Sequence, residues 1–246
     1  MGTLSTTISI KEPELHQGGE GTPPRPGGRD GDGGRASPNY GDRLRRARLG
    51  LAIGLTPVFM LFVSFTSAYI VRQGMGSWDP KANAYARDWL QINLPTQLLL
   101  INTIVLLLST ITVELARRQA PRRGALVAAA TIAGVSPGKE QRFPWLGVTI
   151  LLGAGFLAGQ WMAWKELGAR GFYLATGPSS SFVYLLTGAH AVHLAGGLLA
   201  LLYAASTSLL KRPLEVRRSA VDITAWYWHF MGLLWIYIFA LLEFAR

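Results

Sequence analysis

The sequence predicts an all-α integral membrane protein with a bundle of five transmembrane helices. Half of its 246 residues are hydrophobic and only 15% are charged, a balance that is unusual for a soluble protein. The chain also contains five separate apolar segments, each close to the roughly 20 helical residues that cross a hydrocarbon layer of about 30 Å. Helix formation is the means by which such segments satisfy their backbone polar groups in lipid.

The predicted spans follow a polar N-terminal region. Residues 1–42 are rich in Gly, Pro, Arg and Asp, and we expect them to form a disordered cytoplasmic tail that precedes a membrane domain at 43–246. The predicted spans are residues 49–71, 94–115, 146–164, 182–202 and 223–242. Glu114 is the only formally charged residue within them, and at its helix end it can pair with Arg117 or Arg118.

The distribution of basic residues predicts the orientation in the membrane. Near the span ends, four Arg lie just before the first span (Arg43, Arg45, Arg46 and Arg48), six Lys or Arg separate the second and third spans, and four separate the fourth and fifth. The connectors on the opposite side contain three and two, which by the positive-inside rule places the N-terminus in the cytoplasm and the C-terminus outside. Topology therefore explains the net charge of +10, and we expect no nucleic-acid partner. An apolar stretch at 124–133 is too short to span, and we expect it on the inner membrane surface.

Three histidines lie within the predicted spans. His190 and His193 are three residues apart on the fourth span, and His229 lies at a depth similar to that of His193 on the fifth, so that these two could meet. Imidazole is a common haem ligand, so one hypothesis is a membrane b-type cytochrome. The other is that each imidazole bonds to a neighbouring helix, a water molecule or a lipid headgroup. The chain has no cysteine, which excludes thiolate metal sites and iron–sulfur clusters.

Other polar and aromatic residues in the spans are candidates for contacts between helices or with lipid. Amide side chains need partners and should face protein rather than hydrocarbon. With the three histidines, the candidate contact residues are Asn102, Thr103, Gln160, Thr187, Trp226, Tyr227 and Trp228. The glycine pairs Gly50/Gly54 and Gly155/Gly159 have a spacing that lets helix backbones approach closely. A small transporter is disfavoured by the lack of an internal repeat and of a carboxylate in mid-membrane.

Motifs in all five spans resemble one known family. The fourth span with its approach reads SSSFVYLLTGAHAVHLAGG (179–197), and the fifth contains AWYWHFMGLLW (225–235). The first three contain AYIVR (68–72), NTIVLLLST (102–110) and FLAGQWMAW (156–164). Together, and in this order, these segments resemble subunit III of the haem–copper oxidases, the cytochrome c oxidase subunit III family. Five spans are typical of its shorter bacterial members.

The resemblance implies a non-catalytic role. Subunit III carries no haem or copper, packs against the catalytic subunit I in a complex that includes subunit II, contacts phospholipid, and supports assembly, proton uptake and stability. It implies that the haem and copper lie on the partner subunit, in an oxidase that moves electrons from cytochrome c or a quinol to oxygen in the bacterial cytoplasmic membrane. We therefore expect no catalytic residue, cofactor or metal site on this chain. A subunit III-like protein associated with nitric oxide reductase is the nearest alternative.

The chain departs from the family pattern at three positions. Family members carry acids where this sequence has Val58, Ala163 and Gly232. The replacements put the transfer of carboxylate-linked roles, including the binding of particular lipids, in doubt. The inferred fold depends on many other positions.

Overall fold

The computed structural model describes residues 40–79, 83–86, 89, 94–130, 144–210 and 212–244. The expected tail at 1–42 lies outside these residues, except for Tyr40 to Asp42, which begin the first helix. Most of the connector between the second and third helices, residues 131–143, is also outside them.

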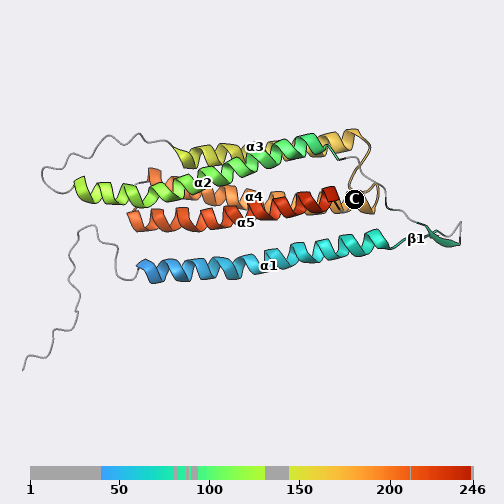
Figure 1. Cartoon of the computed structure of the whole chain (residues 1–246), viewed down its shortest axis with the longest axis horizontal. Coiled ribbons are helices and arrows are strands. Elements are labelled where there is room, and N and C mark those ends of the chain that lie inside the picture. Colours follow the sequence, from blue (N-terminus) through green and yellow to red (C-terminus); the bar gives the residue numbers. More distant parts are fainter. Residues whose placement is uncertain are drawn as a thin grey trace, which may run out of the picture. The chain divides into compact units, whose positions relative to one another are not determined.

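Five long helices dominate the described part of the chain (Figure 1). They are α1 (Tyr40–Gly74), α2 (Thr96–Ala130), α3 (Trp145–Ala169), α4 (Pro178–Leu209) and α5 (Leu214–Phe244). Two short antiparallel strands, β1 (Ser77–Asp79) and β2 (Ala84–Ala86), lie between α1 and α2. Each helix contains a stretch long and apolar enough to cross a membrane. The predicted all-α, five-span fold is therefore confirmed.

The helices extend beyond the predicted spans at most of their ends. The longest, α1 and α2, have 35 residues each, so each is about 50 Å long and exceeds a hydrocarbon layer of about 30 Å. The excess arises because a helix satisfies its own backbone at any depth, so it need not end where apolar residues end. We expected the stretch at 124–133 to lie on the inner membrane surface. Its described part, up to Ala130, continues α2.

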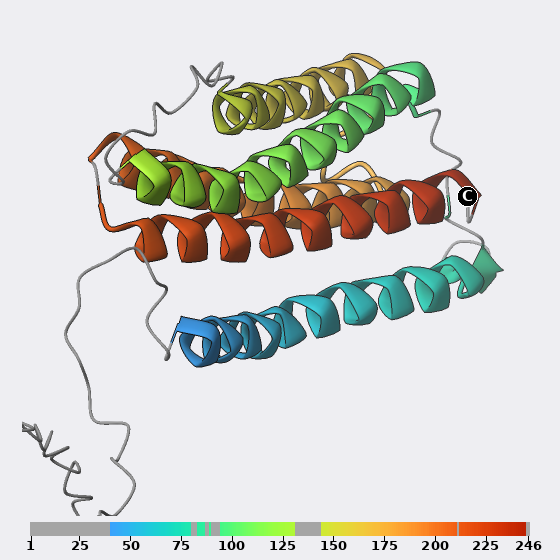
Figure 2. The ribbon, with the colours of Figure 1, turned by 60° about the vertical axis from the view of Figure 1, so that its left-hand side comes forward.

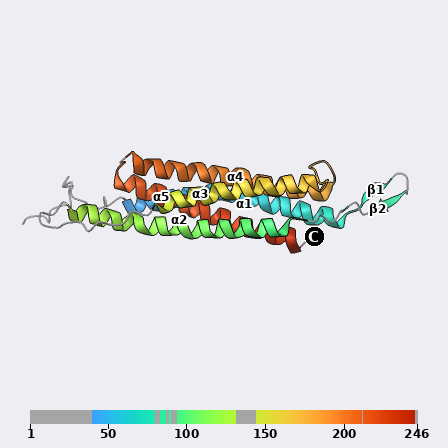
Figure 3. The ribbon, with the colours of Figure 1, turned by 90° about the horizontal axis from the view of Figure 1, so that it is seen from above.

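Helices α2 to α5 form a four-helix core. Contacts link α2 to α3, α3 to α4, α4 to α5 and α5 back to α2, which closes a ring (Figures 2 and 3). Neighbours are antiparallel, because Thr96 near the start of α2 lies beside Glu243 at the end of α5, while Ser109 contacts Trp228. Large side chains from all four helices are completely enclosed, among them Leu106, Phe156, Leu194 and Trp235.

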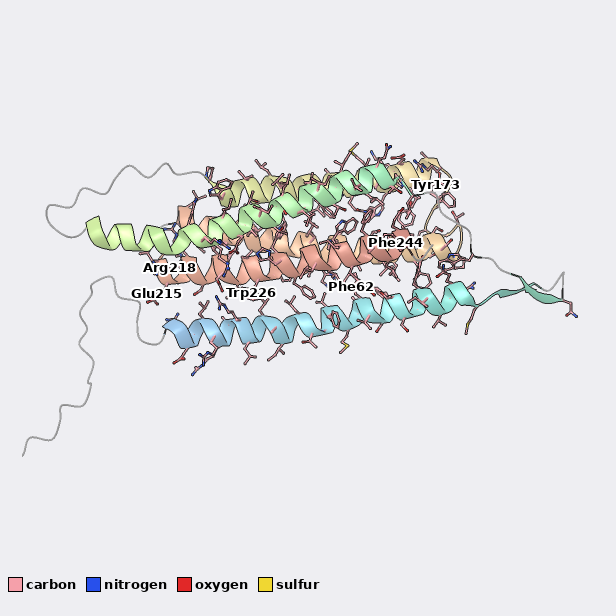
Figure 4. All side chains as sticks on the ribbon, viewed as in Figure 1. Phe62, Tyr173, Glu215, Arg218, Trp226 and Phe244 are labelled. Carbon is pink, nitrogen blue, oxygen red and sulfur yellow. The ribbon has the colours of Figure 1, made fainter. Side chains whose placement is uncertain are left out.

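Helix α1 packs against one side of this core, where it contacts α4 and α5 (Figure 2). Only 11% of the residues in its most apolar stretch are buried, compared with 28–44% in the other helices. Phe62 points from α1 towards the core and is 1% exposed (Figure 4). Most of the remaining apolar surface of α1 is open.

Candidate interhelical site

Indole and hydroxyl groups join the helices of the core in pairs. Trp228 Nε1 on α5 donates to Ser109 Oγ on α2 at 2.9 Å, and Trp235 Nε1 donates to Thr103 Oγ1 on α2 at 2.9 Å. Trp164 Nε1 on α3 donates to Thr187 Oγ1 on α4 at 3.0 Å. An indole can only donate a hydrogen bond, so it needs an acceptor when it is buried.

The same hydroxyl groups also donate to their own helices. Thr103 donates to the Leu99 carbonyl at 2.8 Å, and Thr187 donates to the Val183 carbonyl at 2.6 Å. Each hydroxyl therefore uses its proton within its helix and an oxygen lone pair towards the neighbouring helix. Thr103 and Thr187 were predicted from the sequence. Trp164 and Trp235 were not among the candidate residues, because a polar residue in a span indicates that a partner is needed but not which residue is the partner.

Two aromatic residues of α5 fill spaces left by glycines. A Cβ atom at Gly197 on α4 would lie 2.8 Å from Cε1 of Tyr227, and one at Gly153 on α3 would lie 2.8 Å from Cη2 of Trp228. Tyr227 also donates its hydroxyl proton to the carbonyl oxygen of His193 at 2.8 Å. Rings therefore lie against bare backbone at these positions. The third candidate of this motif, Trp226, is instead 51% exposed.

The two candidate amides, Asn102 on α2 and Gln160 on α3, are buried. Asn102 Nδ2 donates to the Phe156 carbonyl at 3.0 Å, and its Oδ1 lies against the backbone of Gly159 so closely that a Cβ there would clash. Gln160 is 2% exposed, and its Oε1 has no hydrogen-bond partner among the described residues. Of the four glycines expected to permit close packing, Gly159 does so. No described atom lies within 4 Å of the Cβ position at Gly50, Gly54 or Gly155.

The three histidines occupy three different environments. His190 is fully buried, with ring centroids 5.2 Å from Trp235 and 5.9 Å from Phe156. His193 Nδ1 lies 2.7 Å from the carbonyl oxygen of Ala189 in its own helix. His229 Nε2 lies 3.5 Å from Glu114 Oε2 on α2.

These contacts separate the histidines rather than gather them. We expected that His193 and His229 could meet, but their polar contacts are with other residues. His193 contacts a carbonyl of its own helix, and His229 contacts Glu114 on α2. His190 is enclosed by rings from α3 and α5. Within the described residues, no group of three or more His, Asp or Glu side chains is arranged to hold a metal ion.

A cluster of charged residues joins α1, α2 and α5 at the end of the bundle where α1 begins. Asp222 on α5 is 8% exposed and accepts two hydrogen bonds from Arg48 on α1, both at 2.8 Å. Arg117 on α2 contacts the same carboxylate at 3.2 Å. Bidentate pairing of this kind satisfies the guanidinium and carboxylate together. We call Arg48, Glu114, Arg117, Arg118 and Asp222 the charged cluster.

The sequence predicted one half of this cluster. Glu114 pairs with both Arg117, at 2.7 Å, and Arg118, at 2.8 Å, as expected for side chains one turn apart. Asp222 was missed because it lies one residue before the predicted start of the fifth span at 223 and was taken for part of a connector. Its neighbours are distant in the chain, so no local pattern identified them.

The three positions without the family's acids are apolar contacts in the structure. Val58 is half-buried against the core, and Ala163 is 4% exposed. At Gly232, an added Cβ would lie 2.9 Å from Cγ2 of Thr110 on α2. A larger side chain at position 232 would therefore require the Thr110 side chain to shift.

Comparison with known families identifies the chain. The family model for cytochrome c oxidase subunit III matches residues 44–245, which include nearly all of the five helices. The chain belongs to the cytochrome c oxidase subunit III family. The resemblance read from the motifs is therefore confirmed.

Relatives named for this subunit come from several bacteria. The chain is 27% identical over 207 residues to a probable cytochrome c oxidase subunit 3 of Nocardia farcinica, covering 83% of this chain and 91% of the relative. It is 26% identical to the cytochrome c oxidase subunit 3 of Corynebacterium diphtheriae, with the same coverage. It is 29% identical to that of Bacillus subtilis, covering 78% and 82%.

These similarities support a subunit III of a haem–copper oxidase, as the sequence predicted. A subunit III belongs to a complex with other oxidase subunits, and the five apolar helices make the chain a multi-pass membrane protein. The nitric oxide reductase and b-type cytochrome alternatives are not favoured.

Proposed function

We propose that this chain is the non-catalytic subunit III of a proton-pumping oxidase in a bacterial cytoplasmic membrane, where it supports assembly, proton uptake and stability of the catalytic subunit. In this proposal the haem and copper lie on the partner catalytic subunit, subunit I, and subunit II is a further member of the complex. The observation that carries it is the family match across residues 44–245, which includes the histidine and tryptophan motifs of α4 and α5.

The contacts of these motifs support a structural role. Tyr227 and Trp228 reach from α5 to the backbone of α4 and to Ser109 on α2, and His190 lies between rings of α3 and α5. Such contacts fix the spacing of helices in lipid, where apolar burial gives little drive for helix association. We propose that the ten candidate contact residues act in this way, with Trp226 facing phospholipid or a partner subunit.

Co-purification tests the proposed partners. A tag on the C-terminus, followed by extraction in mild detergent and mass spectrometry, should recover subunits I and II in equal amounts with this chain. The matched control is a Gly197→Leu variant, in which a large side chain would clash with Tyr227 and should reduce recovery of both partners. Recovery of a nitric oxide reductase in place of an oxidase would contradict the proposal.

We also propose that the charged cluster faces the cytoplasm, with a cytoplasmic tail at 1–42 and an outer C-terminus. The basic residues on that side support this orientation. The natural chain has no cysteine, so single cysteines provide a clean test. A membrane-impermeant thiol reagent added to intact cells should label Tyr173→Cys, an exposed residue at the opposite end of the bundle (Figure 4), and should label Gly41→Cys only after permeabilisation. The reverse pattern would invert the proposed topology.

A further inference from the structure

The core of α2 to α5 contains buried polar atoms without partners. Neither ring nitrogen of His190 has a hydrogen-bond partner among the described residues, and neither does Oε1 of Gln160. His190 is fully buried and Gln160 is 2% exposed. A buried polar group without a hydrogen bond costs about 1–3 kcal/mol, and most such groups are found to be paired with protein or water.

The contacts between α3 and α4 indicate that these two side chains lie in the same layer of the core. Phe156 on α3 contacts His190 on α4, and Trp164 on α3 bonds to Thr187, one turn before His190. Gln160 lies between Phe156 and Trp164 along α3, and all three residues face the core or its edge. The bracketing contacts therefore place Gln160 beside the turn of α4 that carries His190.

The other polar groups of this layer already have partners. Trp235, which contacts the His190 ring, gives its indole proton to Thr103, and Thr103 gives its own to the Leu99 carbonyl. Asn102 bonds to the Phe156 carbonyl. Within this layer, the polar groups that still lack a hydrogen-bond partner among the described residues are therefore the His190 imidazole and the Gln160 amide oxygen.

The chemistry of imidazole determines how many water molecules the His190 ring would need as hydrogen-bond partners. A neutral imidazole has one N–H donor and one acceptor nitrogen, and these point away from each other on different edges of the ring. One water molecule cannot reach both edges. A water molecule has two protons to donate, so one can bond both to the acceptor nitrogen of His190 and to Oε1 of Gln160, and a second can accept from the imidazole N–H.

We infer that an internal water site lies between α3 and α4, with at least two ordered water molecules bound to His190 and one of them bridging to Gln160. His190 and Gln160 thereby share one water-mediated network inside the membrane domain. His190 then links helices through its ring contacts with Phe156 and Trp235 and through water.

High-resolution electron cryo-microscopy of the purified oxidase complex tests the site directly. The expected result is separate density within about 3.2 Å of each ring nitrogen of His190, one peak also lying within that distance of Gln160 Oε1. Continuous packing without such density, or a direct bond between the Gln160 amide and His190, would overturn the inference.

A double-mutant cycle supplies a second, independent test. His190→Leu and Gln160→Met each remove one side of the bridge with little change in volume, and each should lower the thermal midpoint of the complex by ~3–6 °C. The double variant should lose clearly less than the sum of the two, because the bridging water is already lost in either one. The matched control is Leu194→Met, a fully buried apolar position one turn from His190, which should shift the midpoint by less than ~2 °C. Strictly additive losses, or a His190→Leu variant more stable than the parent, would count against the water bridge.

Discussion

Helix α1 and the four-helix core use different means to hold helices together. In the core, hydrogen bonds between helices and rings packed against glycines occur at several levels of α2 to α5. Helix α1 contacts the core along one face, with Arg48 at the charged cluster, Phe62 in the middle and Tyr69 at the far end. These residues are 14 and 7 positions apart, which keeps them close to a single stripe of the helix.

The difference shows how a transmembrane helix can be attached with little buried surface. The ring centroids of Phe62 and His193 are 5.9 Å apart. The ring centroid of Tyr69 lies 5.9 Å from that of Phe182 and 5.1 Å from that of Trp89. Between these points α1 presents apolar side chains and the bare backbone of Gly50 and Gly54 to its surroundings. The core should therefore tolerate few substitutions, whereas α1 should be most sensitive at Arg48, Phe62 and Tyr69.

The largest effect is expected at the charged cluster. Asp222→Asn keeps the shape of the side chain but leaves Arg48 and Arg117 without their shared carboxylate, which should destabilise the domain by about 2–3 kcal/mol. The control is Glu215→Gln. Glu215 pairs with Arg43 at 3.7 Å, and the Arg43 side chain is 65% exposed, so this substitution should cost less than about 0.5 kcal/mol. Thermal midpoints of the purified complexes measure both. Equal midpoints would mean that α1 does not depend on this anchor.

A glycine substitution compares the two regions next. Gly197→Ala in the core would place a methyl group 2.8 Å from the Tyr227 ring and should cost about 2 kcal/mol. Gly54→Ala in α1 meets no described atom within 4 Å and should be neutral or slightly stabilising, because alanine favours helix. Thermal denaturation in the same detergent gives the comparison. A cost at Gly54 as large as that at Gly197 would reveal a close neighbour of α1 in the assembled complex.

A smaller effect is expected from a single interhelical hydrogen bond. Trp235→Phe removes the indole donor to Thr103 and should cost about 1 kcal/mol, in the range measured for hydrogen bonds between transmembrane helices. Trp161→Phe, at a position 58% exposed, should change stability by a few tenths of a kcal/mol. If Thr103→Val abolishes the effect of Trp235→Phe, the loss belongs to this bond. Full additivity would assign it to ring packing instead.

The smallest structural effect is expected at His229. Its contact with Glu114 is 3.5 Å long and its side chain is 36% exposed, so His229→Leu should cost only about 0.5 kcal/mol. We expect this variant to shorten the operational lifetime of the oxidase more than it lowers initial turnover, which continuous oxygen-consumption traces would measure. A variant that assembles normally yet loses the haem spectrum would point to a ligand role.

The sequence was sufficient to predict the five helices but not which residues of different helices contact each other. Runs of apolar residues are local, so all five helices were predicted, and amides and hydroxyls in the spans, such as Asn102 and Thr187, were expected to need protein partners. The identity of a partner depends on how helices rotate and approach, which is why Trp235 for Thr103 and Arg48 for Asp222 were not foreseen. Gly50 and Gly54 show the opposite case. Their spacing suits close helix packing, but no other helix among the described residues packs against them.

The most direct test of the central claim is the metal content of the isolated chain. The claim is that the buried imidazoles and indoles hold helices together and bind no redox centre. The chain expressed without its partner subunits, purified from membranes and analysed by mass spectrometry and optical spectroscopy, should contain less than about one-tenth of an iron or copper atom per polypeptide, while the whole complex contains both. One iron or copper atom per isolated polypeptide, lost on replacing His190, His193 or His229, would contradict the claim.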